Sequence, residues 1–300
     1  MDPRTKQYVP PEPPEQPRGN GPDWQFSVLL PPQAARRAEE VGAGYAAMGV
    51  LTTFALAVLG GAFVGLGALF ASTVGAGALE ALPYGLDRLL RGLAFALGFI
   101  LAVAAGAELF CGNNLIVLAL AARRIPLRRL LRNWLIVFVG NLAGAAGTAV
   151  LVFITAQYAF GEGAGGLAEL ELAASKAELG FLRLISLGIM GNALVCLALW
   201  LAMSARSFTE RALAVLFPVT AFVAAGFEHA VANMYIISVG LLIRGDAAFL
   251  EQAGKTAEEY AALSVSGFFF GNLLPVGIGN IIGGPVLVGL IYWSVHLRKR

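Results

Sequence analysis

One histidine, His229, lies within an otherwise apolar stretch and directly follows a glutamate, Glu228. An imidazole with an unperturbed pKa of about 6.5 can donate or accept a proton near neutral pH. The adjacent carboxylate can fix its orientation or its tautomer. A buried histidine can also simply bridge two helices, but His229 lies at a predicted helix break. We therefore expect it to exchange protons on a substrate path.

The glutamate belongs to a pattern that occurs twice in the chain. Glu108 and Glu228 each follow a glycine by two positions and precede an asparagine, Asn113 or Asn233, by five. A carboxylate in the middle of a bilayer costs roughly 2.5–3.5 kcal/mol. Two such costs at corresponding places predict the same device in both halves, a broken transmembrane helix. We expect Asn113 and Asn233 to cap the helices that resume there, with Asn114 beside the first.

The predicted breaks favour an anion as the substrate. The resumed half-helices, starting near Asn114 and Ala232, would point their positive dipole ends at one central site. Lys176 is a candidate for attracting anions, although an interfacial lysine would look the same. Asn192 is a buried amide that can bond freed backbone groups. Six apolar residues near the breaks are candidates for constrictions: Leu109, Phe110, Phe222, Phe95, Phe99 and Val195.

Composition requires membrane-spanning elements to position these residues. Hydrophobic residues make up 58% of the 300 residues and charged residues only 13%, against about 25% charged in soluble domains. Four charge-free runs reach the ~20 residues needed to cross the hydrocarbon core: 41–79, 133–161, 184–205 and 260–297. Four further charge-free runs are each too short to cross, but they are long enough when joined in pairs: 92–107 with 109–122, and 212–227 with 230–243. The sequence thus predicts six spans, the second and fifth interrupted.

The third span of each half repeats a second pattern. Asn133 precedes Asn141 by eight positions, and Asn272 precedes Asn280 by the same distance. We expect an all-α polytopic membrane protein built from two three-helix repeats. The repeats cover about 41–158 and 176–298. An odd number of spans per repeat inverts the second copy in the membrane.

Charge distribution predicts the orientation of the spans. Five arginines lie between spans 2 and 3: Arg123, Arg124, Arg128, Arg129 and Arg132. The positive-inside rule then places both termini in the cytoplasm. Residues 1–33, which are rich in proline, are expected to form a disordered tail before a membrane domain at 34–300. The net charge of +2 gives no support for a nucleic-acid partner. Both cysteines lie within predicted spans, so we expect no metal site and no cofactor.

Over about residues 34–298 the chain resembles the formate/nitrite transporter family. The resemblance is carried by Glu108-Leu109-Phe110, Asn133-Trp134-Leu135, Gly140-Asn141-Leu142, Gly226-Phe227-Glu228-His229, Ala232-Asn233-Met234, Leu274-Pro275-Val276 and Gly279-Asn280-Ile281-Ile282-Gly283-Gly284. It implies an aquaporin-like six-helix fold and a homopentamer with one pore per protomer. It also implies a multi-pass protein of the bacterial or archaeal inner membrane.

The resemblance also implies roles for individual residues. His229 matches the central pore histidine, Asn192 the asparagine paired with it, and Lys176 the vestibule lysine that draws anions in. Cys111 stands where the family usually has a threonine that bonds the histidine, and a thiol is a weaker donor. The six constriction candidates match or neighbour two apolar constrictions.

These observations favour a channel or transporter for small monovalent anions of weak acids, with formate first and protons as the second partner. Protonation at His229 would yield a neutral acid able to pass the apolar constrictions. Nitrite or hydrosulfide could be the main substrate instead, and lactate or acetate could also pass. A water or glycerol pore of the same architecture is an alternative, although the Asn-Pro-Ala motifs of such pores are missing. An intramembrane hydrolase pairing His229 with a serine is disfavoured, so we expect no enzyme.

Overall fold

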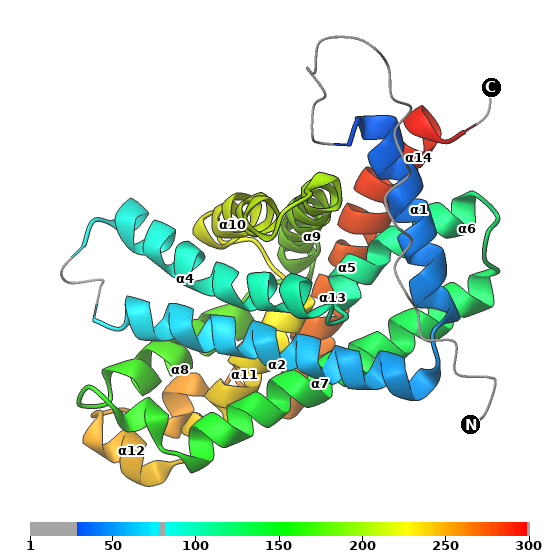
Figure 1. Ribbon diagram of the computed structural model, residues 1–300. Helices are drawn as coiled ribbons and strands as arrows, with labels where there is room; N and C mark the ends of the chain where they lie inside the picture. The colour runs from blue at the N-terminus through cyan, green and yellow to red at the C-terminus, as the bar shows by residue number, and fades with distance from the viewer. Residues whose placement is uncertain (1–28, 78–81, 299–300) are drawn as a thin grey trace, which may run out of the picture.

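The computed structural model describes residues 29–77 and 82–298, and every regular element in these ranges is a helix (Figure 1). In the first half they are α1 (Pro31–Ala47), α2 (Val50–Gly75), α4 (Tyr84–Ala105), α5 (Phe110–Asn113), η1 (Asn114–Ile116), α6 (Val117–Ala121), α7 (Leu127–Ile154) and η2 (Gln157–Ala159). In the second half they are α8 (Ala164–Ala177), α9 (Phe181–Ser204), α10 (Phe208–Ala224), α11 (Ala230–Arg244), α12 (Ala247–Gln252), η3 (Ala257–Tyr260), η4 (Gly267–Leu273), α13 (Leu274–Ile281), η5 (Ile282–Leu290) and α14 (Ile291–His296).

Five helices of the described residues are long and apolar enough to cross a membrane: α2, α4, α7, α9 and the continuous helix Gly267–His296. Two shorter apolar helices, Phe110–Ala121 and Ala230–Arg244, follow α4 and α10. The charge-free runs predicted all of these segments. They underestimated α4, which has 22 residues because it begins at Tyr84 and carries charged residues in its first two turns. Large apolar side chains such as Leu51 and Leu135 are exposed on the outer surface, as expected for a protein in contact with lipid.

Helices of the two halves pack in corresponding ways. In the first half α2 contacts both α4 and α7, and in the second half α9 contacts both α10 and α13. The first long helix of each half therefore lies between the interrupted segment and the third helix. This placement brings it against the backbone of the interruption.

Each interruption begins at a glycine in the left-handed region. Gly106 has a φ of 67° after α4, and Gly226 has a φ of 74° after α10. Side chains with a Cβ are strained there, so glycine ends each helix with little cost. Beyond each turn the chain is extended until α5 or α11 begins. The freed amide of Glu108 donates to Leu56 O (3.1 Å), and that of Glu228 to Leu187 O (3.2 Å).

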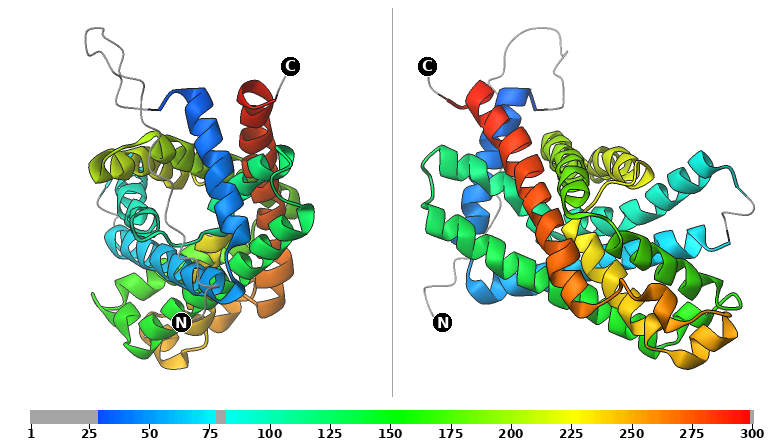
Figure 2. Two further views of the ribbon diagram at one scale, coloured as in Figure 1. Left: turned by 45° about the vertical axis from the view of Figure 1, so that its right-hand side comes forward. Right: turned by 180° about the vertical axis from the view of Figure 1, so that it is seen from behind.

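The short helices gather at opposite ends of the molecule. α1 and α14 lie side by side at one end, whereas α8 and α12 lie at the other (Figures 1 and 2). α1 already begins at Pro31, so residues 31–33 are helical where the sequence predicted a disordered tail. The remaining tail prediction, for residues 1–28, lies outside the described residues. Lys176 lies in the last turn of α8, before α9 begins at Phe181.

Candidate functional site

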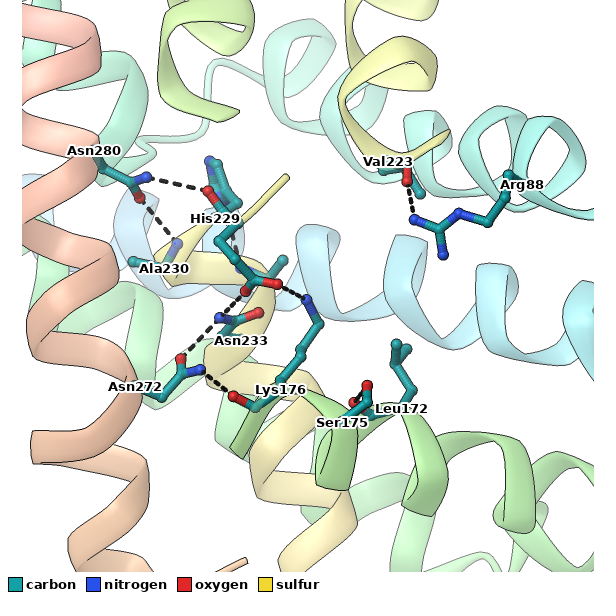
Figure 3. Close-up of polar contacts among 12 residues, drawn as sticks. Arg88, Leu172, Ser175, Lys176, Val223, His229, Ala230, Asn233, Asn272 and Asn280 are labelled. Carbon is teal, nitrogen blue, oxygen red and sulfur yellow. Dashed lines mark hydrogen bonds and ion pairs between the residues drawn. The ribbon is translucent and has the colours of Figure 1, made fainter. Parts of the chain in front are cut away.

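The carboxylate of Glu228 is buried in the second interruption and has two polar partners. Its Oε2 accepts a hydrogen bond from Asn233 Nδ2 (2.6 Å), and its Oε1 pairs with Lys176 Nζ (2.7 Å). Asn233 Nδ2 also donates to Asn272 Oδ1 (2.8 Å), whose amide donates to the Lys176 carbonyl (3.1 Å). These contacts, drawn in Figure 3, join α8, α11 and the last long helix around one charge pair.

The first interruption contains the same contacts without the cation. Glu108 Oε2 accepts from Asn113 Nδ2 (2.5 Å), which also donates to Asn133 Oδ1 (2.8 Å). Glu108 Oε1 is buried without a partner among the described residues. The prediction that Asn113 and Asn233 cap helices is wrong, because both amides bond carboxylates. Asn114 is fully buried, and neither polar atom of its side chain has a partner within the described part of the chain.

Two other asparagines bond the resumed helices. Asn141 Oδ1 accepts from Phe110 N (2.8 Å) at the start of α5, and Asn280 Oδ1 accepts from Ala230 N (3.0 Å) at the start of α11. Each also donates its amide to the carbonyl of the glutamate in the same interruption, at 2.8 Å and 3.2 Å. A buried backbone group without a partner costs about 1–3 kcal/mol. These two side chains therefore stabilise the interruptions.

His229 is the residue immediately before α11 and is 1% exposed. Its Nδ1 accepts from Ala232 N (3.3 Å). This network assigns the proton of the neutral imidazole to Nε2. Nε2 is buried without a partner among the described residues. The ring lies 5.3 Å from that of Phe99 and 5.8 Å from that of Phe222, measured between centroids.

A cavity of about 80 Å³ leads to His229. One buried water needs only about 10–15 Å³ on such a measure, so there is room for a small anion. Three cations line it together with His229: Arg88, Arg91 and Lys176. Phe95 and Phe222 also line it, with ring centroids 5.6 Å apart, and Phe99 packs against both. The cavity is cationic at the sides and aromatic near His229.

Asn192 and Cys111, which were expected beside His229, form hydrogen bonds with Asn280 instead. Asn192 Nδ2 donates to Asn280 O (2.6 Å), and the Cys111 thiol donates to Asn280 Oδ1 (3.3 Å). Neither forms a hydrogen bond with His229 in the described structure. The pairing with His229 that the resemblance implied is therefore replaced by contacts with Asn280.

Three of the constriction candidates lie away from the cavity. Leu109, Phe110 and Val195 are buried but do not line it. The Phe110 ring packs against Trp134 and Phe138, at centroid distances of 6.1 Å and 5.1 Å. Only Phe95, Phe99 and Phe222 are brought together beside His229. For all six candidates, a constriction role stays a prediction.

No site role for Arg88 and Arg91 was predicted from the sequence. A signal was present, because Arg88, Arg91 and Phe95 are spaced three and four positions apart. Residues at this spacing share one helical face. The roles of Asn141 and Asn280 were also missed, although both belong to the repeated pattern of eight positions.

Fold and site together define a polytopic helical membrane protein with a cationic cavity that ends at a buried histidine. The sequence model of one family, described as "Formate/nitrite transporter", matches residues 32–294. The chain belongs to this formate/nitrite transporter family. The family is one of transporters, so an intramembrane hydrolase gains no support.

Individual relatives are similar over nearly their whole length. The chain is 42% identical to "Formate channel FocA" of Escherichia coli (strain K12) over 281 residues, which cover 92% of this chain and 98% of that one. It is 33% identical to "Probable formate transporter" of Methanothermobacter thermautotrophicus, with coverage of 81% and 88%.

Two solved structures are similar as well. "Pentameric formate channel with formate bound" has a TM-score of 0.78 at 39% identity and covers 83% of this chain and 98% of its own. "FNT family ion channel" has a TM-score of 0.73 at 28% identity, with coverage of 87% and 98%.

Proposed function

We propose that this protein is a channel for formate and similar small monovalent anions of weak acids. In this scheme the anion enters the cationic cavity and is neutralised beside His229. It then crosses the apolar region as the free acid, without ATP or a cofactor. The relatives named as formate channels support formate as the substrate.

The geometry of the cavity carries this proposal. Arg88, Arg91 and Lys176 supply positive charge, and His229 Nε2 supplies a donor at the end of the cavity. A carboxylate in contact with Nε2 would exchange its hydration shell for a charge-assisted hydrogen bond. The rings of Phe95 and Phe222 line the same cavity, and Phe99 packs against both. An anion in such surroundings loses several kcal/mol of solvation, whereas a neutral acid loses far less.

Proton transfer from His229 involves both ring nitrogens. Charging the imidazole places a proton on Nδ1 as well, which opens the bond from Ala232 N. That bond is long, at 3.3 Å, and its loss costs about 1 kcal/mol. The proton on Nε2 then passes to a carboxylate oxygen, the imidazole keeps the proton on Nδ1, and the neutral acid leaves. Uptake of a new proton at Nε2 from vestibule water restores the imidazolium, which keeps its proton on Nδ1 from one cycle to the next.

The proposed architecture extends the corresponding contacts of the two halves. Spans 1–3 and 4–6 form two inverted repeats within a membrane domain of residues 34–300, and spans 2 and 5 are broken at Glu108 and Glu228. Both termini lie in the cytoplasm, and five protomers assemble in the membrane, each with its own pore. The pentameric relative supports this assembly. Exposed apolar residues on α2 and α7 are consistent with contacts to lipid and neighbouring protomers.

Uptake of labelled formate into proteoliposomes tests the proposal. Unlabelled formate should compete fully, and nitrite, hydrosulfide and lactate should compete less well. Light-scattering shrinkage with an osmolyte should show no water or glycerol permeability above that of empty vesicles. Absent formate uptake by a folded protein, or nitrite as the better competitor, would contradict formate as the main substrate.

A further inference from the structure

The cavity is lined by cations without any lining carboxylate in the described residues. Arg88 and Arg91 on α4 and Lys176 on α8 reach it from different sides, and His229 lies at its end. In Figure 3 the side chains of Arg88 and Lys176 point toward the same space. The three cations are not equivalent, because their other partners differ.

Two of the three cations are held by a carboxylate. Arg91 Nε pairs with Asp87 Oδ1 at 2.7 Å, and Arg91 Nη2 donates to Gly75 O (2.6 Å). Lys176 Nζ pairs with Glu228 Oε1 at 2.7 Å, in a contact where the side chains are 13% and 3% exposed. Each pair has no net charge. An arriving anion would have to compete with a carboxylate for either cation.

Arg88 has no carboxylate partner within the described ranges. Its Nε donates to Ala224 O (3.1 Å) and its Nη2 to Val223 O (2.5 Å), the carbonyls at the end of α10. A guanidinium has five N–H donors, so Nη1 and one hydrogen of Nη2 stay available. A methyl group on Gly226 would lie 3.2 Å from Nη2. Glycine at this position leaves the guanidinium uncrowded.

We propose that Arg88, and not Lys176, is the residue that docks the anion in the cavity before it reaches His229. The inference rests on the proposed function and assigns Lys176 to holding Glu228 in the second interruption. The backbone contacts to α10 fix the guanidinium plane, and its free edge presents parallel donors. Such an edge suits a small carboxylate, which has two acceptor oxygens.

Substitutions at Arg88 that separate charge from backbone contacts test this assignment. Arg88→Gln keeps a donor for the α10 carbonyls and removes the charge, whereas Arg88→Lys keeps the charge and loses the planar fork. Arg244→Gln is the matched control. Arg244 is also partly buried and donates to two backbone carbonyls, Ala257 O and Leu263 O, but it does not line the cavity.

The readout is labelled formate uptake into proteoliposomes at several formate concentrations, with sodium gluconate setting the ionic strength. A unit charge at contact distance in water contributes about 1 kcal/mol, so Arg88→Gln should raise the half-saturating concentration roughly fivefold. The maximal rate should be retained. Arg88→Lys keeps the charge and loses the planar fork, so it should raise the half-saturating concentration less than Arg88→Gln does. Arg244→Gln should match the unmodified protein.

Salt dependence provides a readout that a purely structural role would not change. The Debye length falls from roughly 30 Å at 0.01 M to about 8 Å at 0.15 M salt. Uptake of subsaturating formate by the unmodified protein should therefore slow as salt increases. This slowing should be weaker in Arg88→Gln and preserved in Arg88→Lys.

The outcomes distinguish this inference from the proposed function. If Arg88→Gln keeps the unmodified half-saturation and salt dependence while carrying formate, the docking role is wrong and the channel stands. Equal effects of Arg88→Gln and Arg88→Lys would assign Arg88 to capping α10 and also overturn it. Failure of the unmodified, folded protein to carry formate would overturn the proposed function and the docking role together.

Discussion

Replacing Lys176 with methionine would leave the carboxylate of Glu228 buried without its cation. The Glu228 side chain is 3% exposed, and its ammonium partner lies 2.7 Å away. Removing one partner of a buried pair costs about 3–5 kcal/mol. Because Glu228 keeps its hydrogen bond from Asn233 Nδ2, we expect a loss near the lower end, about 3 kcal/mol.

The double variant Lys176→Met/Glu228→Gln removes both charges together. A glutamine at 228 can still accept from Asn233, so the total loss should fall to about 1 kcal/mol, about 2 kcal/mol less than in Lys176→Met alone. Formate uptake should be poor in Lys176→Met, because the cation that lines the cavity is lost and an unpaired carboxylate remains behind it. The double variant should regain much of this uptake, since it removes the unpaired charge next to the cavity wall and leaves Arg88 and the net charge of the site unchanged.

Unfolding in detergent, followed by tryptophan fluorescence over a denaturant series, measures the stability of each variant, and proteoliposome uptake measures transport. Lys255→Met is the matched control. Lys255 pairs with Glu259 at 3.5 Å, where the side chains are 31% and 47% exposed, so little change in stability is expected. The reasoning would be refuted if Lys176→Met were as stable as the unmodified protein, or if the double variant were no more stable than Lys176→Met.

Two further predictions concern close packing and buried charge. Gly191→Ala would place a Cβ 2.4 Å from Glu228 O, below the 3.0 Å that such contacts need. The melting temperature should fall, and the free energy of unfolding should decrease by about 2 kcal/mol. Gly277→Ala is the control, because a Cβ there has nothing within 4 Å and should not destabilise the protein. Equal melting temperatures of the two variants would contradict the close packing at Gly191. Burial raises the pKa of Glu169 from 4.5 to about 7, so the folded state keeps a proton that the unfolded state loses between these values. Unfolding free energy should therefore fall by about 3 kcal/mol as pH rises through that window, and an equal fall in Glu169→Gln would refute this origin.

The positions at which the helices stop and resume could be predicted, because each is marked in the sequence by a glutamate that is costly to bury in an apolar stretch. A buried glutamate, a glycine before it and an asparagine after it occur twice, and the structure places both glutamates between helices with matching contacts. Contacts across the fold could not be predicted in this way. Lys176 and Glu228 are 52 positions apart, and nothing in their local sequence shows that they pair.

The direction in which individual side chains point could not be predicted from the sequence either. The capping asparagines could not be told from those that bond carboxylates, because both kinds lie in glycine-rich helices. The structure assigns capping to Asn141 and Asn280 and carboxylate contacts to Asn113 and Asn233. The ring partner of Phe110 on α7 could not be predicted either. Helical periodicity gives the face of a residue, and the partner on that face depends on packing between distant segments.

Formate uptake by His229→Asn as a function of pH tests the central claim most directly. Asparagine is a favoured residue before a helix, so it can keep the acceptor for Ala232 N while removing the titrating ring. Uptake by the unmodified protein should increase several-fold as the donor side is acidified from about pH 8 to about pH 5, because each anion that crosses takes up one proton from the donor side. The folded variant should lose most of this increase, and an unchanged pH profile would contradict neutralisation of the anion at His229.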